Sequence, residues 1–362
     1  MEMDRSCLRL RTMGSFFFGG TVRTVADGET FHGDHGYAQY YIAAHSRHLP
    51  IVLWHGVGQS GRTFESTPDG REGYAALLPR RDWSVYVVDQ PRRGRAGRTE
   101  APPLTADLPA AARESGVWEA FRNGVWEPPG RPSLYAGSQF PLSGAAVDQF
   151  FRQQTPDTGG EPLTAEYRAF MGQTGAALFR RIGDGILITH SNGGQYGWEI
   201  AMASPHVRAV AAYEPGACAF PDDAAPEDVP GAAAGAYLAP RMVPAARWAA
   251  LTKIPILIVW GDYIPDEPSP VFGADVWRIA RARSRQFVRL VNARGGHAEL
   301  MELPKLGIRG NTHAAFADRN QMEILRLLTD WLAAQGLDGY EEPHEGPAPL
   351  AMPMTLPVER ER

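Results

Sequence analysis

Ser191 has neighbours that suit a nucleophile in a hydrolytic reaction. It stands in the run Thr189–Gly193, which follows the apolar residues 186–188 and precedes a helix-compatible segment at 194–204. Small residues two positions to either side of a serine suit a tight turn between a strand and a helix, where large side chains would clash. Such a turn holds the hydroxyl above the sheet, beside the free N–H groups of the next helix. We therefore predict that Ser191 is a nucleophile, although Thr189 replaces the usual first glycine.

A serine nucleophile needs a base that takes its proton and a carboxylate that orients the base. We predict that His313 is the base, because its loop leads into the last expected helix. His297 is the alternative base, because it follows the last expected strand. Glu214 and Asp262 each follow an expected strand, so either could be the acid, and the residues themselves leave this choice open.

The segment Trp54–Gly58 could stabilise negative charge on a substrate oxygen. It is the end of an apolar run that enters a glycine-rich turn, where backbone N–H groups can approach a bound oxygen closely. The predicted donors of this oxyanion site are the N–H group of Val57 or Gly58 and that of Asn192, which follows the nucleophile.

Neither the histidines nor the cysteines form a metal-binding pattern. His32 and His35 resemble a metal pair, but no third ligand accompanies them in the sequence. Cys7 and Cys218 have neither metal-ligand spacing nor the pattern of a disulfide framework. We therefore expect a reaction that needs no metal and no cofactor.

The net charge of the chain and its apolar segments indicate which partners and which cellular location to expect. A net charge of -5 gives no reason to expect nucleic acid or an anionic membrane as a partner. The basic segment Arg92–Arg98 is short and broken by glycine, so we interpret it as a solvated loop. The apolar block Phe16–Phe18 is too short for a signal-peptide core, which favours a soluble cytoplasmic protein. The expected partner is a small-molecule ester, and a homodimer is compatible with the sequence.

Short apolar runs alternate with helix-like segments, which is typical of a mostly parallel sheet with helices on both faces. The first two strands are expected to pair as an antiparallel hairpin at the sheet edge. The predicted strands are Phe16–Val25, Ala38–Ala44, Ile51–His55, Ser84–Asp89, Gly185–His190, Ala209–Tyr213, Ile256–Trp260 and Gln286–Leu290. The predicted helices are Tyr74–Leu78, Gly194–Ser204, Asp275–Arg283 and Asn320–Gln335.

Two segments interrupt this alternation. The core is predicted at 14–98 and 184–338, and 99–183 is predicted to be a cap above the carboxyl ends of the strands, where ligands bind in open α/β sheets. The segment 219–249 could join this cap, and the tail 339–362 is predicted to be poorly ordered. Aromatic residues of these segments either pack internally or line an apolar substrate pocket; the pocket candidates are Trp118, Trp126, Tyr135, Phe140 and Phe220.

Several short segments of the chain match the sequence motifs of one known group of proteins. They are Gly14–Gly20, Trp54–Gly56, Thr67–Arg71, Thr189–Gly194, Glu214–Gly216, Gly261–Asp262 and Gly307–Asn320. In these segments the chain resembles the α/β-hydrolases, and more narrowly the bacterial carboxylesterases of the Alcaligenes esterase type, which have a Ser–Glu–His triad. The Pro-Asp-Gly-Arg and Asp-Arg-Asn motifs are not general features of the hydrolases, so the match is fairly specific.

The resemblance implies the α/β-hydrolase fold with an inserted cap, Ser191 as nucleophile, Glu214 as acid and His313 as base. Asp262 has the commoner acid position among hydrolases, but this group does not use it for the triad. The typical member carries adjacent cysteines in its oxyanion loop, where this chain has Val57–Gly58. The typical member is also exported, whereas we see no signal segment here.

These residues predict a serine hydrolase that cleaves a carboxylic ester or lactone through an acyl-enzyme intermediate. The same site could instead hydrolyse a carbon–carbon or amide bond, or transfer an acyl group, and product analysis would distinguish these reactions. A noncatalytic ligand-binding protein of the same fold is a further alternative, in which a fluorophosphonate probe would leave Ser191 unlabelled.

Overall fold

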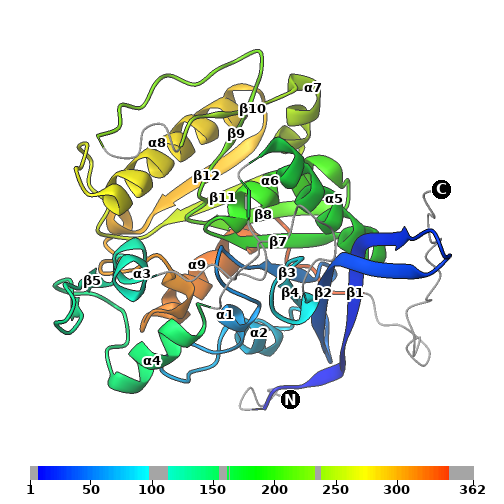
Figure 1. Cartoon of the computed structure of the whole chain (residues 1–362), viewed down its shortest axis with the longest axis horizontal. Helices are drawn as coiled ribbons and strands as arrows, with labels where there is room; N and C mark the ends of the chain where they lie inside the picture. The colour runs from blue at the N-terminus through cyan, green and yellow to red at the C-terminus, as the bar shows by residue number, and fades with distance from the viewer. Residues whose placement is uncertain (1–6, 98–112, 155–160, 163, 233–237, 342–362) are drawn as a thin grey trace.

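An eight-stranded, mostly parallel sheet forms the centre of the protein in this computed structural model (Figure 1). The structure describes residues 7–97, 113–154, 161–162, 164–232 and 238–341. The strand order is β1-β2-β4-β3-β7-β8-β11-β12. These strands are β1 (Leu10–Thr24), β2 (Thr30–Ala43), β3 (Ile51–Trp54), β4 (Val85–Asp89), β7 (Gly185–His190), β8 (Val207–Tyr213), β11 (Pro255–Trp260) and β12 (His297–Glu302).

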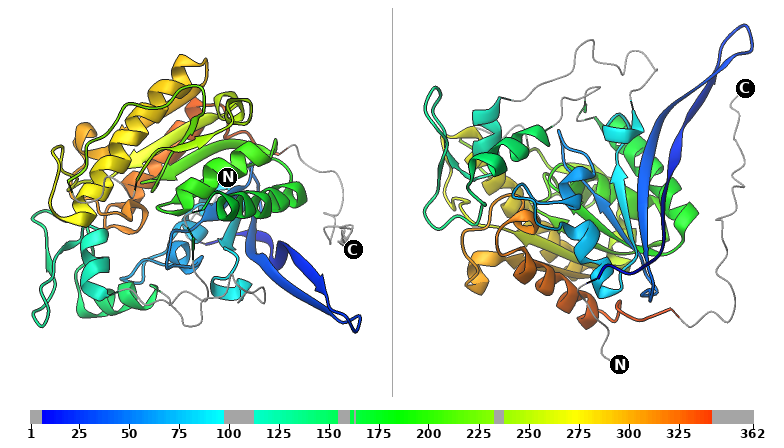
Figure 2. Two further views of the ribbon diagram at one scale, coloured as in Figure 1. Left: turned by 45° about the horizontal axis from the view of Figure 1, so that its top comes forward. Right: turned by 90° about the horizontal axis from the view of Figure 1, so that it is seen from below.

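The edge hairpin predicted for the first two strands is confirmed. β1 and β2 pair antiparallel, β2 pairs antiparallel with β4, and every later neighbour in the sheet is parallel. Both strands are longer than the sequence indicated, and the far end of the hairpin projects away from the body of the protein (Figure 2).

The helices cover both faces of the sheet. On one face, side chains of α5, α6 and α8 share a buried apolar cluster with Val52 and Trp54 of β3. On the other face, side chains of α2 and α9 share a second cluster with Ile51 and Leu53 of the same strand. Alternate side chains of a strand point to opposite faces, so a strand buried on both sides is apolar throughout. The helices are α1 (Arg62–Glu65), α2 (Tyr74–Leu77), α3 (Glu114–Ala120), α4 (Gly144–Arg152), α5 (Ala165–Ile182), α6 (Gly193–Ala203), α7 (Ala245–Trp248), α8 (Phe272–Ala293) and α9 (Gln321–Ala334).

The strand predicted at Gln286–Leu290 is wrong. These residues lie in α8, in which Ile279, Arg283, Phe287 and Val291 are buried at helical spacing. Three apolar residues within five have the same appearance in a short strand and in one face of a helix, so the segment alone could not decide between them. The last strand of the sheet is β12, which begins at His297.

The predicted insertion at 99–183 extends too far toward its carboxyl end. The helix α5 packs on α6 and β1, and its Met171 and Phe179 belong to the core beneath the sheet. The described remainder contains α3, α4 and the two-stranded pair β5 (Gly124–Val125) and β6 (Ser133–Leu134), which lie together at one end of the protein (Figure 1). Below, "the insertion" means the described residues 113–154 and 161–162.

The segment 219–249 does not join the insertion in its described part. Its strands β9 (Ala219–Pro221) and β10 (Arg241–Val243) pair in parallel, and Trp248 of α7 packs on Phe287 of α8. At the carboxyl end, the predicted tail begins with ordered contacts, since Tyr340 pairs with Arg47, and 342–362 lie outside the described residues. None of the described helices combines the length and the apolar content that a membrane span requires.

Candidate active site

Ser191 occupies a strained turn between β7 and α6. Its φ of +55° is in the left-handed region, which is uncommon for residues other than glycine. The turn is held on both sides, because the Ser191 N–H donates to the carbonyl oxygen of Tyr213 and the Gly216 N–H donates to that of Ser191, each at 2.9 Å. Only 7% of the residue is exposed. A strand therefore ends before the serine and a helix begins after it, as the sequence predicted.

The departure from the usual small-residue pattern at Thr189 is compensated within α6. A Cβ on Gly197 would lie 2.7 Å from the Thr189 methyl carbon, so a glycine one turn into the helix makes room for the threonine. Gly193 has the opposite role in the turn itself, since its Cβ would lie 2.3 Å from the carbonyl oxygen of His55. The absence of a side chain at Gly193 allows the end of β3 to approach the serine turn.

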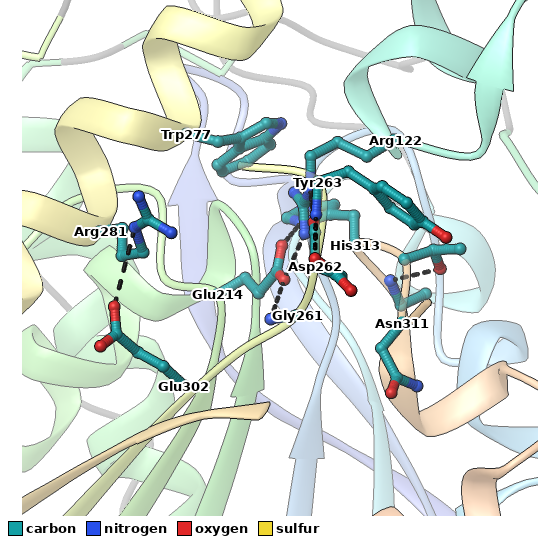
Figure 3. A network of polar contacts seen from close by, with 12 residues as sticks. Arg122, Glu214, Gly261, Asp262, Tyr263, Trp277, Arg281, Glu302, Asn311 and His313 are labelled. Atoms are coloured by element: carbon teal, nitrogen blue, oxygen red, sulfur yellow. Dashed lines mark hydrogen bonds and ion pairs between the residues drawn. The ribbon is translucent and has the colours of Figure 1, made fainter. Parts of the chain in front are cut away.

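The structure brings His313 together with Glu214. The Nδ1 atom of His313 lies 2.5 Å from Oε2 of Glu214, and both side chains are buried (Figure 3). We call these two residues the imidazole–carboxylate pair. Asp262 does not contact the imidazole: its Oδ2 accepts from the Gly310 N–H at 3.0 Å, and its Oδ1 accepts from the Tyr263 N–H at 2.8 Å. Asp262 therefore holds the start of the His313 loop.

Glu214 reaches the imidazole from the end of β8 through a backbone turn of its own. Its φ is +47°, and its N–H donates to the carbonyl oxygen of Val259 in β11 at 2.9 Å. Its Oε1 accepts from the Gly261 N–H at 2.7 Å and from Arg122 Nη2 at 2.5 Å. Burial alone would raise the pKa of Glu214, but the charge of Arg122 and the contact with His313 outweigh it and lower the pKa to about 2.

The imidazole of His313 is enclosed by two aromatic rings. Its centre lies 4.1 Å from the ring centre of Trp277 and 5.1 Å from that of Phe121. Burial lowers the pKa of His313, and the hydrogen bond with Glu214 only partly opposes that effect. A neutral imidazole facing an ionised carboxylate carries its proton on Nδ1, so Nε2 keeps a free lone pair that can accept a proton.

Ser191 and His313 lie at the same edge of the sheet. The ring of His190, next to the serine, is centred 4.6 Å from the His313 ring, and its Nε2 lies 3.0 Å from the carbonyl oxygen of His313. Within the described ranges, no hydrogen bond joins the Ser191 hydroxyl to His313. Catalytic hydrogen bonds of this kind often tighten only in the complex with substrate.

The alternative base, His297, is excluded by its position. It is the first residue of β12 and pairs with Pro255, the first residue of the parallel strand β11. It therefore lies at the amino ends of the strands, at the edge opposite to Ser191. The side chain is exposed and contacts Glu299. His297 was an alternative only because the last strand was predicted at Gln286–Leu290, before this residue. The strand in fact begins at His297.

The segment that holds two of the predicted oxyanion donors approaches the serine turn at Gly56. A Cβ on Gly56 would lie 2.9 Å from Cβ of Ser191, so this glycine allows the two turns to touch. Val57 follows and is 46% exposed, and Gly58 has a φ of +68°. Asn192 is the N-cap of α6, where the backbone N–H groups are left free by the helix.

Two comparisons relate this arrangement to known proteins. A solved structure of a novel bacterial esterase is 28% identical in sequence and superposes with a TM-score of 0.72, over 92% of this chain and 99% of the esterase. The chain has the α/β-hydrolase fold. A probable secreted lipase from a fungus (Fungal sp. strain ATCC 74256) is 26% identical over 323 residues, which are 83% of this chain and 86% of the lipase. No family model matches the chain. The predicted resemblance to α/β-hydrolase esterases is confirmed.

Two sequence motifs that are unusual for an α/β-hydrolase brace the loop of His313. Arg71, of the Pro-Asp-Gly-Arg motif, donates to the carbonyl oxygens of Ala317 and Asp318, each at 3.0 Å. The Asp318 carboxylate, of the Asp-Arg-Asn motif, accepts from the N–H and the hydroxyl of Thr312 at 2.7 and 2.9 Å. The two motifs therefore fix the backbone on both sides of the imidazole.

The interpretation of the segment Arg92–Arg98 as a solvated loop is wrong for its first two arginines. Arg92 is buried and pairs with Asp34 at 2.9 Å. Arg93 is buried and pairs with Glu161 of the insertion at 2.7 Å, and Glu161 also accepts from Asn192 Nδ2 at 2.6 Å. The insertion thus contacts Asn192, the residue directly after Ser191. Glu161 and Arg122 lie outside every motif, so nothing in the sequence pointed to either residue.

Three of the predicted pocket residues are packed inside the protein. Trp118 is fully buried and lies edge-on to Phe140, with ring centres 5.1 Å apart, in the interior of the insertion. Phe220 is buried against Phe287 of α8, beside a small cavity whose lining includes neither Ser191 nor His313. These aromatic residues stabilise the fold rather than line a pocket at the serine.

The other two predicted pocket residues are partly exposed. Trp126 packs on Phe151, with ring centres 5.4 Å apart. Tyr135 packs on Tyr263 at 4.9 Å, above the loop that follows β11. Tyr135 thus packs against the loop that contains Asp262 and stays a candidate for substrate contact.

Replacing Gly193 by alanine should disrupt the serine turn. The new Cβ would clash with the backbone oxygen of His55, directly after β3, which cannot rotate away. Relief by backbone shifts costs about 1–3 kcal/mol and would displace Ser191. We expect a lower Tm and, on any ester that the wild-type protein hydrolyses, a large loss of kcat/KM. Gly116→Ala in α3 is the control, since its Cβ would meet no atom within 4 Å, and both values should stay near wild type. A fully active Gly193→Ala enzyme would contradict this account of the turn.

Proposed function

We propose that the chain is a serine esterase that hydrolyses a carboxylic ester or a lactone of modest size. The observation that carries the proposal is the buried imidazole–carboxylate pair beside a serine held at positive φ. The similar bacterial protein is named an esterase and the similar fungal protein a probable lipase, which supports an ester as the substrate.

In the first half of the reaction, the Ser191 hydroxyl attacks the ester carbonyl and its proton passes to Nε2 of His313. Glu214 holds Nδ1–H of the imidazole and stabilises the positive charge that forms there. The carbonyl oxygen becomes an oxyanion, which accepts hydrogen bonds from the N–H of Asn192 and that of Val57 or Gly58. The imidazolium then gives its proton to the leaving alcohol, and an acyl-enzyme remains.

In the second half, water replaces the alcohol. His313 takes a proton from the water as the water oxygen attacks the acyl carbonyl, and the same N–H groups hold the second oxyanion. Collapse of this intermediate breaks the bond to Ser191 Oγ, which recovers its proton from His313. The carboxylic acid is released and the site returns to its first state.

The first test is turnover of a panel of p-nitrophenyl esters, bulkier aromatic esters and lactones, with Ser191→Ala as the blank. Product analysis in water, and in water with an added alcohol, separates hydrolysis from acyl transfer. No turnover of any ester by the wild-type protein, together with no labelling by a fluorophosphonate, would contradict the proposal and favour a noncatalytic role.

Hydrolysis should be insensitive to EDTA and to dithiothreitol. The proposed steps use only protein groups, and the described residues contain no group of three or more His, Cys, Asp and Glu side chains that could hold a metal ion. Cys7 and Cys218 are not joined in a disulfide, and Val57–Gly58 stands where the resembling esterases have adjacent cysteines. Rates measured before and after dialysis with each reagent should agree. A large loss with dithiothreitol at unchanged Tm would show that the oxyanion loop has been misread.

The cellular location and the oligomeric state of the protein stay predictions. The sequence favoured a cytoplasmic protein, whereas the fungal relative is named a secreted lipase. Fractionation of the natural host and gel filtration of the purified protein would decide the location and test the homodimer.

A further inference from the structure

One short stretch of the insertion, residues 120–122, runs across the imidazole–carboxylate pair. The indole N–H of Trp277 on α8 donates to the carbonyl oxygen of Ala120 at 2.7 Å. The backbone N–H of His313 donates to the carbonyl oxygen of Phe121 at 2.9 Å. Consecutive residues of the insertion are therefore bonded to two different elements of the core, directly beside the imidazole.

Arg122 continues this stretch and turns its side chain toward Glu214. Its Nη2 donates to Oε1 of Glu214 at 2.5 Å, and its Nε donates to the carbonyl oxygen of Asp262 at 2.8 Å (Figure 3). Its guanidinium carbon lies 5.9 Å from the ring centre of Trp277. The arginine is buried and has a φ of +54°, a conformation that persists only where the surroundings impose it.

The two oxygens of Glu214 have separate partners. Oε1 accepts from Arg122 and from the Gly261 N–H, and Oε2 is left to Nδ1 of His313. Two donors on Oε1 hold the carboxylate plane, so Oε2 cannot rotate away from the imidazole. We propose that Arg122 is a positioning residue: the insertion supplies it to fix the Glu214 carboxylate in the orientation that keeps the His313 proton on Nδ1.

This inference rests on the proposed function, and it explains why the acid can lie after β8. The loop after β11, where many hydrolases keep their acid, here supplies the Gly261 N–H to the carboxylate and the Asp262 carbonyl oxygen to Arg122. The loop after β11 therefore holds in place an acid that follows the neighbouring strand, β8, instead of supplying the acid itself.

The charge of Arg122 also bears on the pH range of the reaction. Burial lowers the pKa of His313, Glu214 raises it, and the nearby Arg122 lowers it. The base is active only when neutral, that is, above its pKa. Removing the positive charge should raise this pKa and move the acid limb of kcat/KM to higher pH. The other titratable side chains around the pair are His190 on β7, Asp318 on the same loop and Asp262 after β11.

The experiment compares Arg122→Met, Arg122→Lys, Glu214→Gln and the double variant Arg122→Met/Glu214→Gln on one ester over a range of pH. Arg278→Gln on α8 is the matched control, because Arg278 is also buried and ion-paired, with Asp275, but does not contact the imidazole–carboxylate pair. Tm and circular dichroism report the fold of every variant.

Arg122→Met should lower kcat on the order of 10²-fold with little change in KM, and its acid limb should move to higher pH. Lysine keeps the charge but cannot bridge two acceptors as a planar guanidinium does, so Arg122→Lys should lose rate while its acid limb stays near wild type. In the Glu214→Gln background, adding Arg122→Met should lower kcat by less than about 3-fold, because the two residues act as one unit. Arg278→Gln should keep its kcat.

The inference is overturned if Arg122→Met, folded as wild type, keeps its kcat and its acid limb. It is also overturned if the losses in the double variant simply multiply, because an arginine that only supports the fold would act independently of Glu214. Should Arg122→Met fail to fold, an unchanged kcat for Arg122→Lys would overturn it. Activity in Ser191→Ala would instead refute the proposed function, so the two failures can be told apart.

Discussion

Ser191→Ala should lose nearly all ester hydrolysis while keeping the fold. Alanine removes only the attacking hydroxyl, and the turn is held by backbone hydrogen bonds of Ser191 that alanine retains. Loss of a triad nucleophile costs on the order of 10⁴- to 10⁶-fold in kcat. The measurement is kcat on the best ester of the panel, with Tm and circular dichroism to compare the folds.

A fluorophosphonate probe provides the independent check. It should form a stable adduct with the wild-type protein, located at Ser191 by mass spectrometry, and should leave Ser191→Ala unmodified. More than about a tenth of wild-type activity in a correctly folded variant is far above the expectation for a lost nucleophile. That result, or an adduct on another residue, would remove Ser191 from the proposed mechanism.

Glu214→Gln should cost much more activity than Asp262→Asn. The amide keeps the size of the glutamate but loses the charge that stabilises the imidazolium, and it can favour the wrong imidazole tautomer. The corresponding change in a serine protease lowers kcat about 10⁴-fold. It would also leave the buried Arg122 without its counter-ion, so some loss of Tm is expected as well.

Asp262→Asn is the matched control for that experiment. Asp262 follows the neighbouring strand, and its carboxylate accepts backbone N–H groups of Tyr263 and Gly310 rather than the imidazole. An asparagine retains one acceptor oxygen, so the expected loss in kcat is within about tenfold and arises from loop geometry. Both variants are measured on one ester at one pH. A dead Asp262→Asn enzyme beside a nearly normal Glu214→Gln enzyme would reverse the assignment of the acid.

Local patterns sufficed where a function is encoded within a few consecutive residues. The apolar run before Ser191 and the small residues around it predicted the strand, the turn and the helix with nearly the observed bounds. The same reasoning failed over 286–290, because a five-residue segment with apolar residues at Phe287, Val288 and Leu290 suits both a strand and one face of α8. That error moved the last strand and with it the alternative base His297.

The sequence by itself determined the fold class, the serine turn and the loop of His313, because hydrophobic alternation and turn chemistry act between near neighbours. The residues alone left Glu214 and Asp262 open as the acid, and only the resemblance favoured Glu214. The tertiary structure brings Glu214 to His313 across 99 positions, Arg122 to Glu214 across 92, and Arg93 to Glu161 across 68. Such contacts depend on strand order, register and the path of the insertion over the sheet. No periodicity or spacing records these features, so only the folded chain shows which charges are buried together.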